Sequence, residues 1–258
     1  MDHHGTAHFD EWVAPASLRC VEIISDLHLA RQTPGTIKAW QCYMAQTRAD
    51  AVFILGDLFE TWVGDDSRFS EFEARCVDIL ARASNRVNLA FMVGNRDFLV
   101  GNQMLEACRM QALRDPTVLV AFGQRYLLTH GDALCLADTE YQQFRTLVRD
   151  PQWQAQLLAR PLEERRELAR EMRAGSMERQ AGRLGDSAVD IDTTMALDWL
   201  DRANSKTLIH GHTHRPGSDC PAPGVLRHVL SDWSCDDEPH RAEALRLDAN
   251  GIQRQPLI

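Results

Sequence analysis

The chain has 258 residues, of which 44% are hydrophobic and 25% are charged, a balance typical of a soluble globular protein. Its formal net charge of −9 argues against a general nucleic-acid-binding protein, so we expect no nucleic-acid partner. No apolar run approaches the length of a transmembrane helix. The seven cysteines, an odd number without a C-x-x-C pair, indicate reduced thiols, as in a cytoplasmic protein.

The first half of the chain alternates between strand and helix patterns. Residues 1–18 show no periodicity, and we expect a flexible N-terminal extension there. Short apolar runs and helical spacings then predict the following order: strand 20–25, helix 36–48, strand 51–55, helix 67–83, strand 88–93 and helix 102–110. A hairpin is expected over residues 117–129. Alternation of this kind indicates an α/β fold.

Polar side chains follow the ends of five predicted strands. The clearest case is the apolar run 51–55, which reads as a buried parallel strand and is followed at once by Gly56 and Asp57. Four other predicted strands are also followed by polar side chains. These are Asp26 with His28, then Asn95, then His130, and finally His212 with His214. Alternation along a strand predicts that Asp26 and His28 point to the same side.

Asp57 and the other six side chains supply carboxylate, amide and imidazole ligands without a cysteine. This mixture suits Mn²⁺, Fe²⁺ or Zn²⁺ in five- or six-coordinate sites. One ion rarely needs seven protein ligands, whereas two ions that share one bridging carboxylate would use them all. The pattern therefore predicts a two-metal site.

The strand pattern is interrupted between residues 138 and 205. Apolar residues recur there at helical spacing, and nine Arg stand against seven acidic residues between positions 140 and 183. We expect a helical lid insertion at 138–205, within a core formed by residues 19–137 and 206–258. Strands are expected again at 207–210, 225–230, 243–247 and 252–257, with a hairpin turn at Asn250-Gly251. This antiparallel tail predicts a second sheet packed on the first.

The motifs Asp26-x-His28, Gly56-Asp57, Gly94-Asn95, His130 and Gly211-His212-x-His214 resemble those of the calcineurin-like metallophosphoesterases. The stretches SDLHLA, ILGDLFETWVGDD, GNRDFL, THGDALC and LIHGHTHRPG, together with MRAGS in the lid, are similar to the UDP-2,3-diacylglucosamine pyrophosphatases of the lipid A pathway. The resemblance implies a four-layer αββα sandwich with an inserted helical lid and two Mn²⁺ ions. It also implies cleavage of UDP-2,3-diacylglucosamine to UMP and 2,3-diacylglucosamine 1-phosphate, with water attacking the α-phosphorus.

The resemblance also implies roles for individual residues. One metal ion takes Asp26, His28 and His214, the other takes Asn95, His130 and His212, and Asp57 bridges them. The catalytic residues are Asp57, Asn95, Arg96 and His130. The positions that contact substrate are Asn95, Arg96, Asp138, Ser176, Gln180, Arg183 and His212. Gln180 stands where related sequences often have Asn, and Arg183 where they often have Lys.

Arg96 distinguishes this chain from many protein phosphatases of the same fold, which carry a His at that position of the Asn-x-Asp motif. A phosphate leaving group needs little protonation, and a guanidinium can hold a second phosphate through two hydrogen bonds. Arg96 therefore favours a substrate with two linked phosphates. A nucleotide phosphodiesterase acting on a soluble diphosphate remains an alternative. A non-catalytic binding module is another, although such modules lose metal ligands.

The expected substrate carries two acyl chains, and the chain is expected to meet it at a membrane surface. We expect a cytoplasmic protein that is peripherally attached to the inner face of the inner membrane. The apolar and Arg-rich faces of the lid would make this contact.

Overall fold

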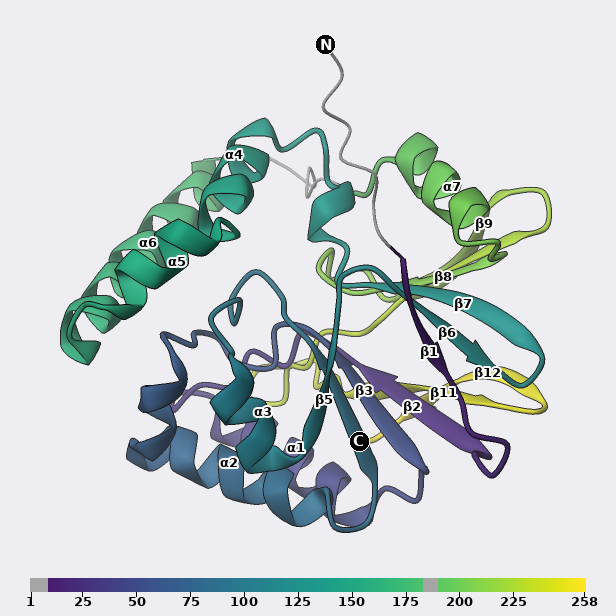
Figure 1. Ribbon diagram of the computed structural model, residues 1–258, viewed down its shortest axis with the longest axis horizontal. Helices are drawn as coiled ribbons and strands as arrows, with labels where there is room; N and C mark the ends of the chain where they lie inside the picture. The colour runs from purple at the N-terminus through teal and green to yellow at the C-terminus, as the bar shows by residue number, and fades with distance from the viewer. Residues whose placement is uncertain (1–8, 183–189) are drawn as a thin grey trace.

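The computed structural model describes residues 9–182 and 190–258, with side chains for residues 9–174 and 190–258. Two six-stranded sheets pack face to face, helices cover their outer faces, and three further helices form an arm at one edge (Figure 1). This is the four-layer αββα fold that the sequence predicts.

The first sheet carries three of the five ligand-bearing strand ends. Its strands in spatial order are β12 (Gly251–Pro256), β11 (Glu243–Asp248), β2 (Cys20–Ile24), β3 (Ala51–Leu55), β4 (Asn88–Met92) and β5 (Met110–Leu113). The four strands from β2 to β5 are mutually parallel. Its outer face is covered by α1 (Pro34–Gln46), α2 (Glu71–Ala83) and α3 (Asn102–Cys108), and the short helix η1 (Asp65–Phe69) precedes α2.

The second sheet carries the other two ligand-bearing ends. Its spatial order is β1 (Asp10–Val13), β6 (Thr117–Ala121), β7 (Gln124–Thr129), β8 (Thr207–His210), β10 (Val225–Val229) and β9 (Gly217–Ala222). β7 and β8 are parallel, so their carboxyl ends lie at the same edge. The short helix η2 (Asp132–Leu134) follows β7, and α7 (Thr193–Arg202) covers the outer face.

The apolar side chains divide into one layer between the sheets and one layer beneath each outer helical cover. Val21, Ile23 and Phe53 point into the middle layer, whereas Ile24 and Ile54 pack against the outer helices. Successive strand residues point to opposite faces, so a strand that is covered on both sides must be apolar throughout. This explains the uninterrupted apolar run of β3.

The arm consists of α4 (Thr139–Val148), α5 (Pro151–Leu158) and α6 (Leu162–Gly182), and it projects from the edge of the sandwich in Figure 1. Arg165 of α6 is 3% exposed, and its guanidinium donates to the carboxylate of Asp66 and to the carbonyl of Val63. Arg149 at the end of α4 donates to the carbonyl of Gly94 over 2.9 Å. The arm is therefore fixed to the loops that follow β3 and β4.

Two predicted boundaries are wrong. Asp10–Val13 forms β1 and pairs in parallel with β6, and Leu18 is buried, so residues 10–18 do not form the flexible extension expected over 1–18. Residues 1–8 lie outside the described residues. The insertion is also shorter than 138–205, because Trp199 and Leu200 of α7 pack on the second sheet as part of the core.

The tail of the chain also differs from the prediction. β11 and β12 form the expected hairpin, but β11 pairs with β2 and so extends the first sheet. The hairpin residues are Ala249 and Asn250, and Gly251 already pairs with Asp248. The predicted helix 102–110 ends at Cys108 and is followed by β5, and the edge strand β9 lacks the apolar alternation that would have predicted it.

Candidate active site

The five predicted segments meet where the carboxyl ends of the two sheets converge. Gly211 after β8 donates its amide to the carbonyl of His130 after β7 over 3.0 Å. The two sheets are joined by the amide of His212, which donates to Asp26 Oδ2 over 3.0 Å. In the first sheet, the amide of Asp26 donates to the carbonyl of Gly56 over 3.2 Å. These hydrogen bonds hold the ligand-bearing turns against one another.

Five of the predicted metal ligands have a left-handed backbone, with φ between 48° and 68°: Asp26, His28, Asp57, His212 and His214. Non-glycine residues are uncommon in this region, and each costs on the order of 1–3 kcal/mol that the surrounding fold must offset. Asp26 and His28 therefore lie in a turn beyond β2. They do reach the same site, but strand alternation is not the reason.

The first group of candidate ligands contains Asp26, His28 and His214, whose ligand atoms lie within 4.8 Å of one another. His28 Nε2 is 3.1 Å from His214 Nε2, and the latter is 3.6 Å from Asp26 Oδ1. Burial alone would raise the pKa of Asp26, but the hydrogen bond to His214 and the surrounding imidazoles lower it well below its usual range. Asp26 therefore remains a carboxylate.

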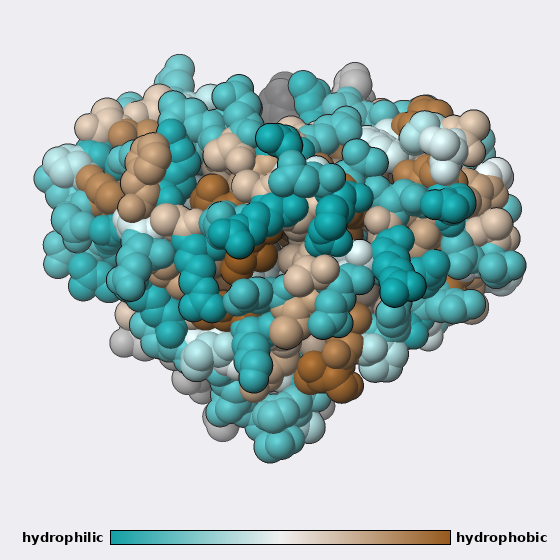
Figure 2. Space-filling view, turned by 90° about the horizontal axis from the view of Figure 1, so that it is seen from below, coloured by the Kyte–Doolittle hydropathy of each residue, from teal (hydrophilic) through white to brown (hydrophobic). Residues whose placement is uncertain are grey.

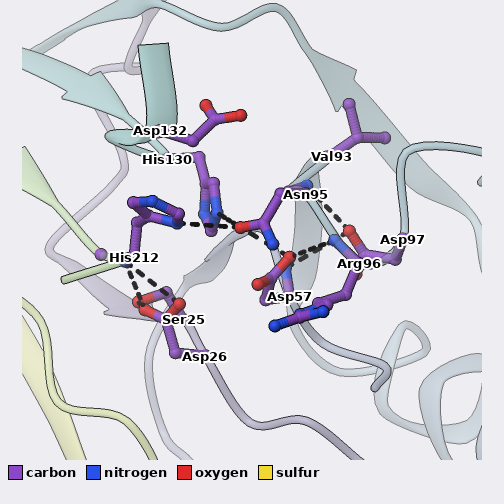
Figure 3. Close-up of polar contacts among 12 residues, drawn as sticks. Ser25, Asp26, Asp57, Val93, Asn95, Arg96, Asp97, His130, Asp132 and His212 are labelled. Carbon is purple, nitrogen blue, oxygen red and sulfur yellow. Dashed lines mark hydrogen bonds and ion pairs between the residues drawn. The ribbon is translucent and has the colours of Figure 1, made fainter. Parts of the chain in front are cut away.

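The second group contains Asn95, His130 and His212. Asn95 Oδ1 lies 2.9 Å from His130 Nε2 and 2.8 Å from His212 Nδ1. Figure 3 draws these contacts as dashed lines. Asp57 Oδ1 is 3.8 Å from His130 Nε2, while Asp57 Oδ2 is 3.9 Å from His28 Nε2. The carboxylate of Asp57 thus lies between the two groups, where a bridging ligand is expected.

Two glycines make room for the buried carboxylates. A Cβ atom on Gly94 would lie 2.1 Å from Asp57 Oδ1, and one on Gly211 would lie 2.2 Å from Asp26 Oδ2. Neither distance is compatible with a side chain, because real Cβ contacts essentially never fall below 3.0 Å. The Gly-Asn and Gly-His pairs of the sequence are therefore steric requirements of the site.

The two buried imidazoles of the second group have opposite pKa shifts. Burial would lower the pKa of His130, but the carboxylates of Asp57 and Asp132 help to raise it to about 9. Burial and the charge of His130 lower the pKa of His212 to about 4. His212 is thus neutral at pH 7, as a metal ligand must be, whereas His130 would release its proton when a cation binds.

Asp97 connects the turns after β3 and β4 through hydrogen bonds to both. Its side chain is fully buried and accepts the amides of Gly94 and Leu58, each over 2.8 Å. Burial and the charge of Asp57 raise the pKa of Asp97 to about 6. This carboxylate fixes the loop that positions Asn95 and Arg96.

Asp132 supports the site from the side of the arm. Tyr141 and Arg145 of α4 donate to its Oδ2 over 2.6 and 2.9 Å. The Tyr141 ring also lies with its centroid 5.7 Å from that of His212. The base of the arm is therefore packed against the second group of candidate ligands.

The donor set fits divalent metal ions. The Nε2 atoms of His28 and His214 lie 3.1 Å apart, beside the buried carboxylates of Asp26 and Asp57. A cation bound among these ligand atoms would stabilise their close approach. Carboxylate, amide and imidazole donors without thiolate suit Mn²⁺, Fe²⁺ or Zn²⁺. All seven predicted metal ligands come together here.

The predicted substrate contacts fall into three sets. Asn95, Arg96 and His212 lie in the cluster, and the Arg96 amide donates to Asp57 Oδ1 over 2.8 Å. Asp138 forms the N-cap of α4 and accepts the amide of Tyr141. Ser176 and Gln180 lie in the last part of α6, beyond the side chains that the structure describes, and Arg183 lies outside the described residues.

Two further residues reach the site without having been predicted. Glu60 Oε2 lies 3.1 Å from His28 Nδ1, and Glu60 Oε1 contacts Arg173 of α6. Both residues stand in stretches that the sequence comparison singled out, FETWVGDD and MRAGS, so a test of every charged residue in those stretches would have found them.

The calcineurin-like phosphoesterase family matches residues 21–216, a segment that includes every candidate metal ligand. The chain therefore belongs to this family, whose proteins have a site for two metal ions.

Relatives within the family share nearly the whole length of the chain. A protein of Chromobacterium violaceum is named UDP-2,3-diacylglucosamine hydrolase and is 42% identical over 245 residues, covering 92% of this chain and 98% of the relative. A protein of Xanthomonas oryzae pv. oryzae with the same name is 41% identical over 245 residues, covering 89% and 95%. Another, from Xanthomonas axonopodis pv. citri, is 40% identical over 250 residues, covering 91% and 97%.

Proposed function

We propose that this protein hydrolyses the diphosphate of UDP-2,3-diacylglucosamine to UMP and 2,3-diacylglucosamine 1-phosphate in lipid A biosynthesis. One observation carries the proposal: the carboxylate of Asp57 lies between two groups of candidate metal ligands, 3.8 Å from His130 Nε2 and 3.9 Å from His28 Nε2, and guanidinium groups lie beside them. Arg96 Nε and Arg173 Nη1 are buried and have no hydrogen-bond partner among the described side chains. Burial and then the charge of Arg96 lower the pKa of Arg173. A phosphate would relieve both effects.

The proposal includes two Mn²⁺ ions. Asp26, His28 and His214 would hold one, Asn95, His130 and His212 would hold the other, and Asp57 would contact both. When bound, the ions would polarise the phosphoryl oxygens and make water a better nucleophile near neutral pH. Adding Mn²⁺, Mg²⁺, Zn²⁺ or Fe²⁺ separately to metal-free protein, and measuring activity with each, tests the identity of the metal.

The residues of the chain would position the substrate for attack at the α-phosphorus. Asn95 Oδ1 faces His130 Nε2 and His212 Nδ1, which leaves Nδ2 of the same amide as the donor that would bind a phosphoryl oxygen. Arg96 would bind the departing sugar phosphate, whose negative charge grows in the transition state. Hydrolysis in ¹⁸O-water should label UMP, and label in the sugar phosphate would show attack at the other phosphorus.

A pocket beside the arm favours the acylated substrate over a soluble diphosphate. It has a volume of about 440 Å³ and lies between α6 and the loop after β3, with Val63, Ala169 and Ala174 among its lining residues. Arg173 also lines it, so the pocket adjoins the contact with Glu60. We propose that an acyl chain enters here. Activity should fall as the acyl chains are shortened, whereas equal rates on UDP-sugars without acyl chains would favour the alternative enzyme.

We also propose peripheral attachment to the cytoplasmic face of the inner membrane. Within the described part of the chain, no helix is long and apolar enough to cross a bilayer. Phe69 of η1 is 75% exposed and Leu158 at the end of α5 is 42% exposed. Seen from below, the surface is mostly hydrophilic, with brown apolar side chains set among and behind hydrophilic ones (Figure 2). Such exposed apolar groups beside an Arg-rich helix suit an anionic lipid surface.

Sedimentation with anionic liposomes tests the attachment. Phe69→Ser should release the protein into the supernatant, and high salt should do the same. Val13→Ser is the matched control, because Val13 is 65% exposed but lies on the edge strand β1 of the second sheet, whereas Phe69 belongs to η1 beside the first sheet. A wild-type protein that stays in solution with liposomes at low salt would contradict the attachment. The proposed reaction would not be affected by that result.

A further inference from the structure

Glu60 contacts a metal ligand with one carboxylate oxygen and the lid arm with the other. Its Oε2 lies 3.1 Å from His28 Nδ1, and its Oε1 forms an ion pair with Nε of Arg173. The opposite ring nitrogen of His28, Nε2, faces His214 and Asp57 at 3.1 and 3.9 Å. One nitrogen of His28 thus faces the other candidate metal ligands, and the other nitrogen faces Glu60.

The backbone fixes this contact. Beyond the ends of β2 and β3, the amide of His28 donates to the carbonyl of Asp57 over 3.0 Å, and the amide of Glu60 donates to the carbonyl of Leu29 over 3.1 Å. These bonds continue the parallel pairing and place His28 and Glu60 side by side. The contact is close but not fully aligned for a hydrogen bond, since His28 Nδ1 has no well-directed acceptor among the described residues.

The electrostatic environment keeps Glu60 ionised. The guanidinium of Arg173 pairs with it from α6, and a neighbouring guanidinium favours the charged form of a carboxyl group. The side chains of Glu60 and His28 are 24% and 20% exposed, so this pair is better shielded than a surface ion pair. Arg173, at 32% exposed, closes the pair on the side of α6.

We propose that Glu60 is a positioning residue that orients His28 for metal binding and couples this ligand to the lid arm through Arg173. A carboxylate on the outer nitrogen of a metal-binding histidine fixes the tautomer and increases ligand basicity, and its loss typically weakens metal binding 10- to 100-fold. Because Arg173 shares the carboxylate, occupancy of the metal site and docking of α6 would stabilise each other. The inference rests on the proposed metal-dependent function.

The test uses Glu60→Gln, which keeps the shape of the side chain and removes its charge. Glu71→Gln is the matched control, because Glu71 also pairs with an arginine, Arg31, over 3.3 Å but is 90% exposed. Electron paramagnetic resonance of free Mn²⁺, titrated into metal-free protein, should show about 10- to 100-fold weaker binding at one site in Glu60→Gln. Glu71→Gln should bind as wild type does. Glu60→Asp keeps the charge and should recover part of the affinity.

Hydrogen exchange of the peptide 162–182 tests the coupling to the arm. Mn²⁺ should slow exchange there in the wild type and in Glu71→Gln, but much less in Glu60→Gln at saturating metal. Unchanged Mn²⁺ affinity in a folded Glu60→Gln protein would overturn the role in positioning. An equal effect of Mn²⁺ on exchange in Glu60→Gln would overturn the coupling. Both readouts need no substrate, so failure of the wild type to hydrolyse UDP-2,3-diacylglucosamine would refute the proposed reaction alone.

Discussion

The close approach of Gly94 to Asp57 gives a sharp prediction for Gly94→Ala. The new Cβ would lie 2.1 Å from Asp57 Oδ1 and 2.4 Å from its amide nitrogen. Ordinary contacts begin at 3.4 Å, so the carboxylate would have to move by about 1.3 Å, the difference between 3.4 and 2.1 Å. A displacement of about 1 Å at a reacting centre can cost 10²-fold in rate. We therefore expect kcat/KM on UDP-2,3-diacylglucosamine to fall at least about 100-fold.

The same substitution should leave the protein folded. Overpacking costs about 1–3 kcal/mol, and each kcal/mol lowers the Tm by roughly 2–4 °C in a domain of this size. Thermal unfolding monitored by circular dichroism measures this loss. Gly217→Ala is the control, because its Cβ would meet only the carbonyl of Arg215 at 3.8 Å. Activity of Gly94→Ala within threefold of the control would refute the steric argument.

Three further perturbations follow from the site. Asp57→Ala should abolish activity while the protein stays folded, because both ligand groups lose their shared carboxylate; wild-type turnover with two ions bound would contradict the assignment. Arg96→Ala should lower kcat more than it raises KM, since the leaving phosphate gains charge in the transition state, and a raised KM at constant kcat would reduce Arg96 to an anchor. Removal of metal by a chelator should abolish activity and lower the Tm, and added Mn²⁺ should restore both; an unchanged Tm would show that the ions contribute nothing to stability.

The metal site could be predicted from the sequence because its ligands stand directly after apolar strands. Asp57 follows β3 within two residues, and the carboxyl ends of parallel strands share one edge of a sheet. The left-handed conformation of Asp57 and His212 could not be predicted in this way, because neither residue type requires it. Both residues are held by contacts with segments distant in the sequence: the Asp57 amide donates to Asp97 Oδ1 over 3.3 Å and the His212 amide to Asp26 Oδ2 over 3.0 Å, with φ values of 52° and 68°.

The errors in the predicted fold have a common physical cause. Asp10–Val13 has no apolar alternation, yet it pairs with β6 because Trp12 packs edge-on against Phe53 with a centroid distance of 5.0 Å. β11 has the right pattern for a strand, but the pattern does not say which sheet it joins. Local periodicity identifies an element, whereas its partners are chosen by contacts across the fold.

The strained and charged residues of the site need a large surrounding fold to stabilise them. Five left-handed ligands at about 1–3 kcal/mol each would cost as much as a typical net stability of about 5–15 kcal/mol, so the rest of the fold must offset this strain. Asp26, Asp57 and Asp97 are also buried together, with at most 1% of each exposed. The fold tolerates this concentration of strain and charge because two complete sheets hold the turns from both sides. Bound cations would remove the repulsion among the carboxylates, so the ions are expected to act in folding stability as well as in chemistry.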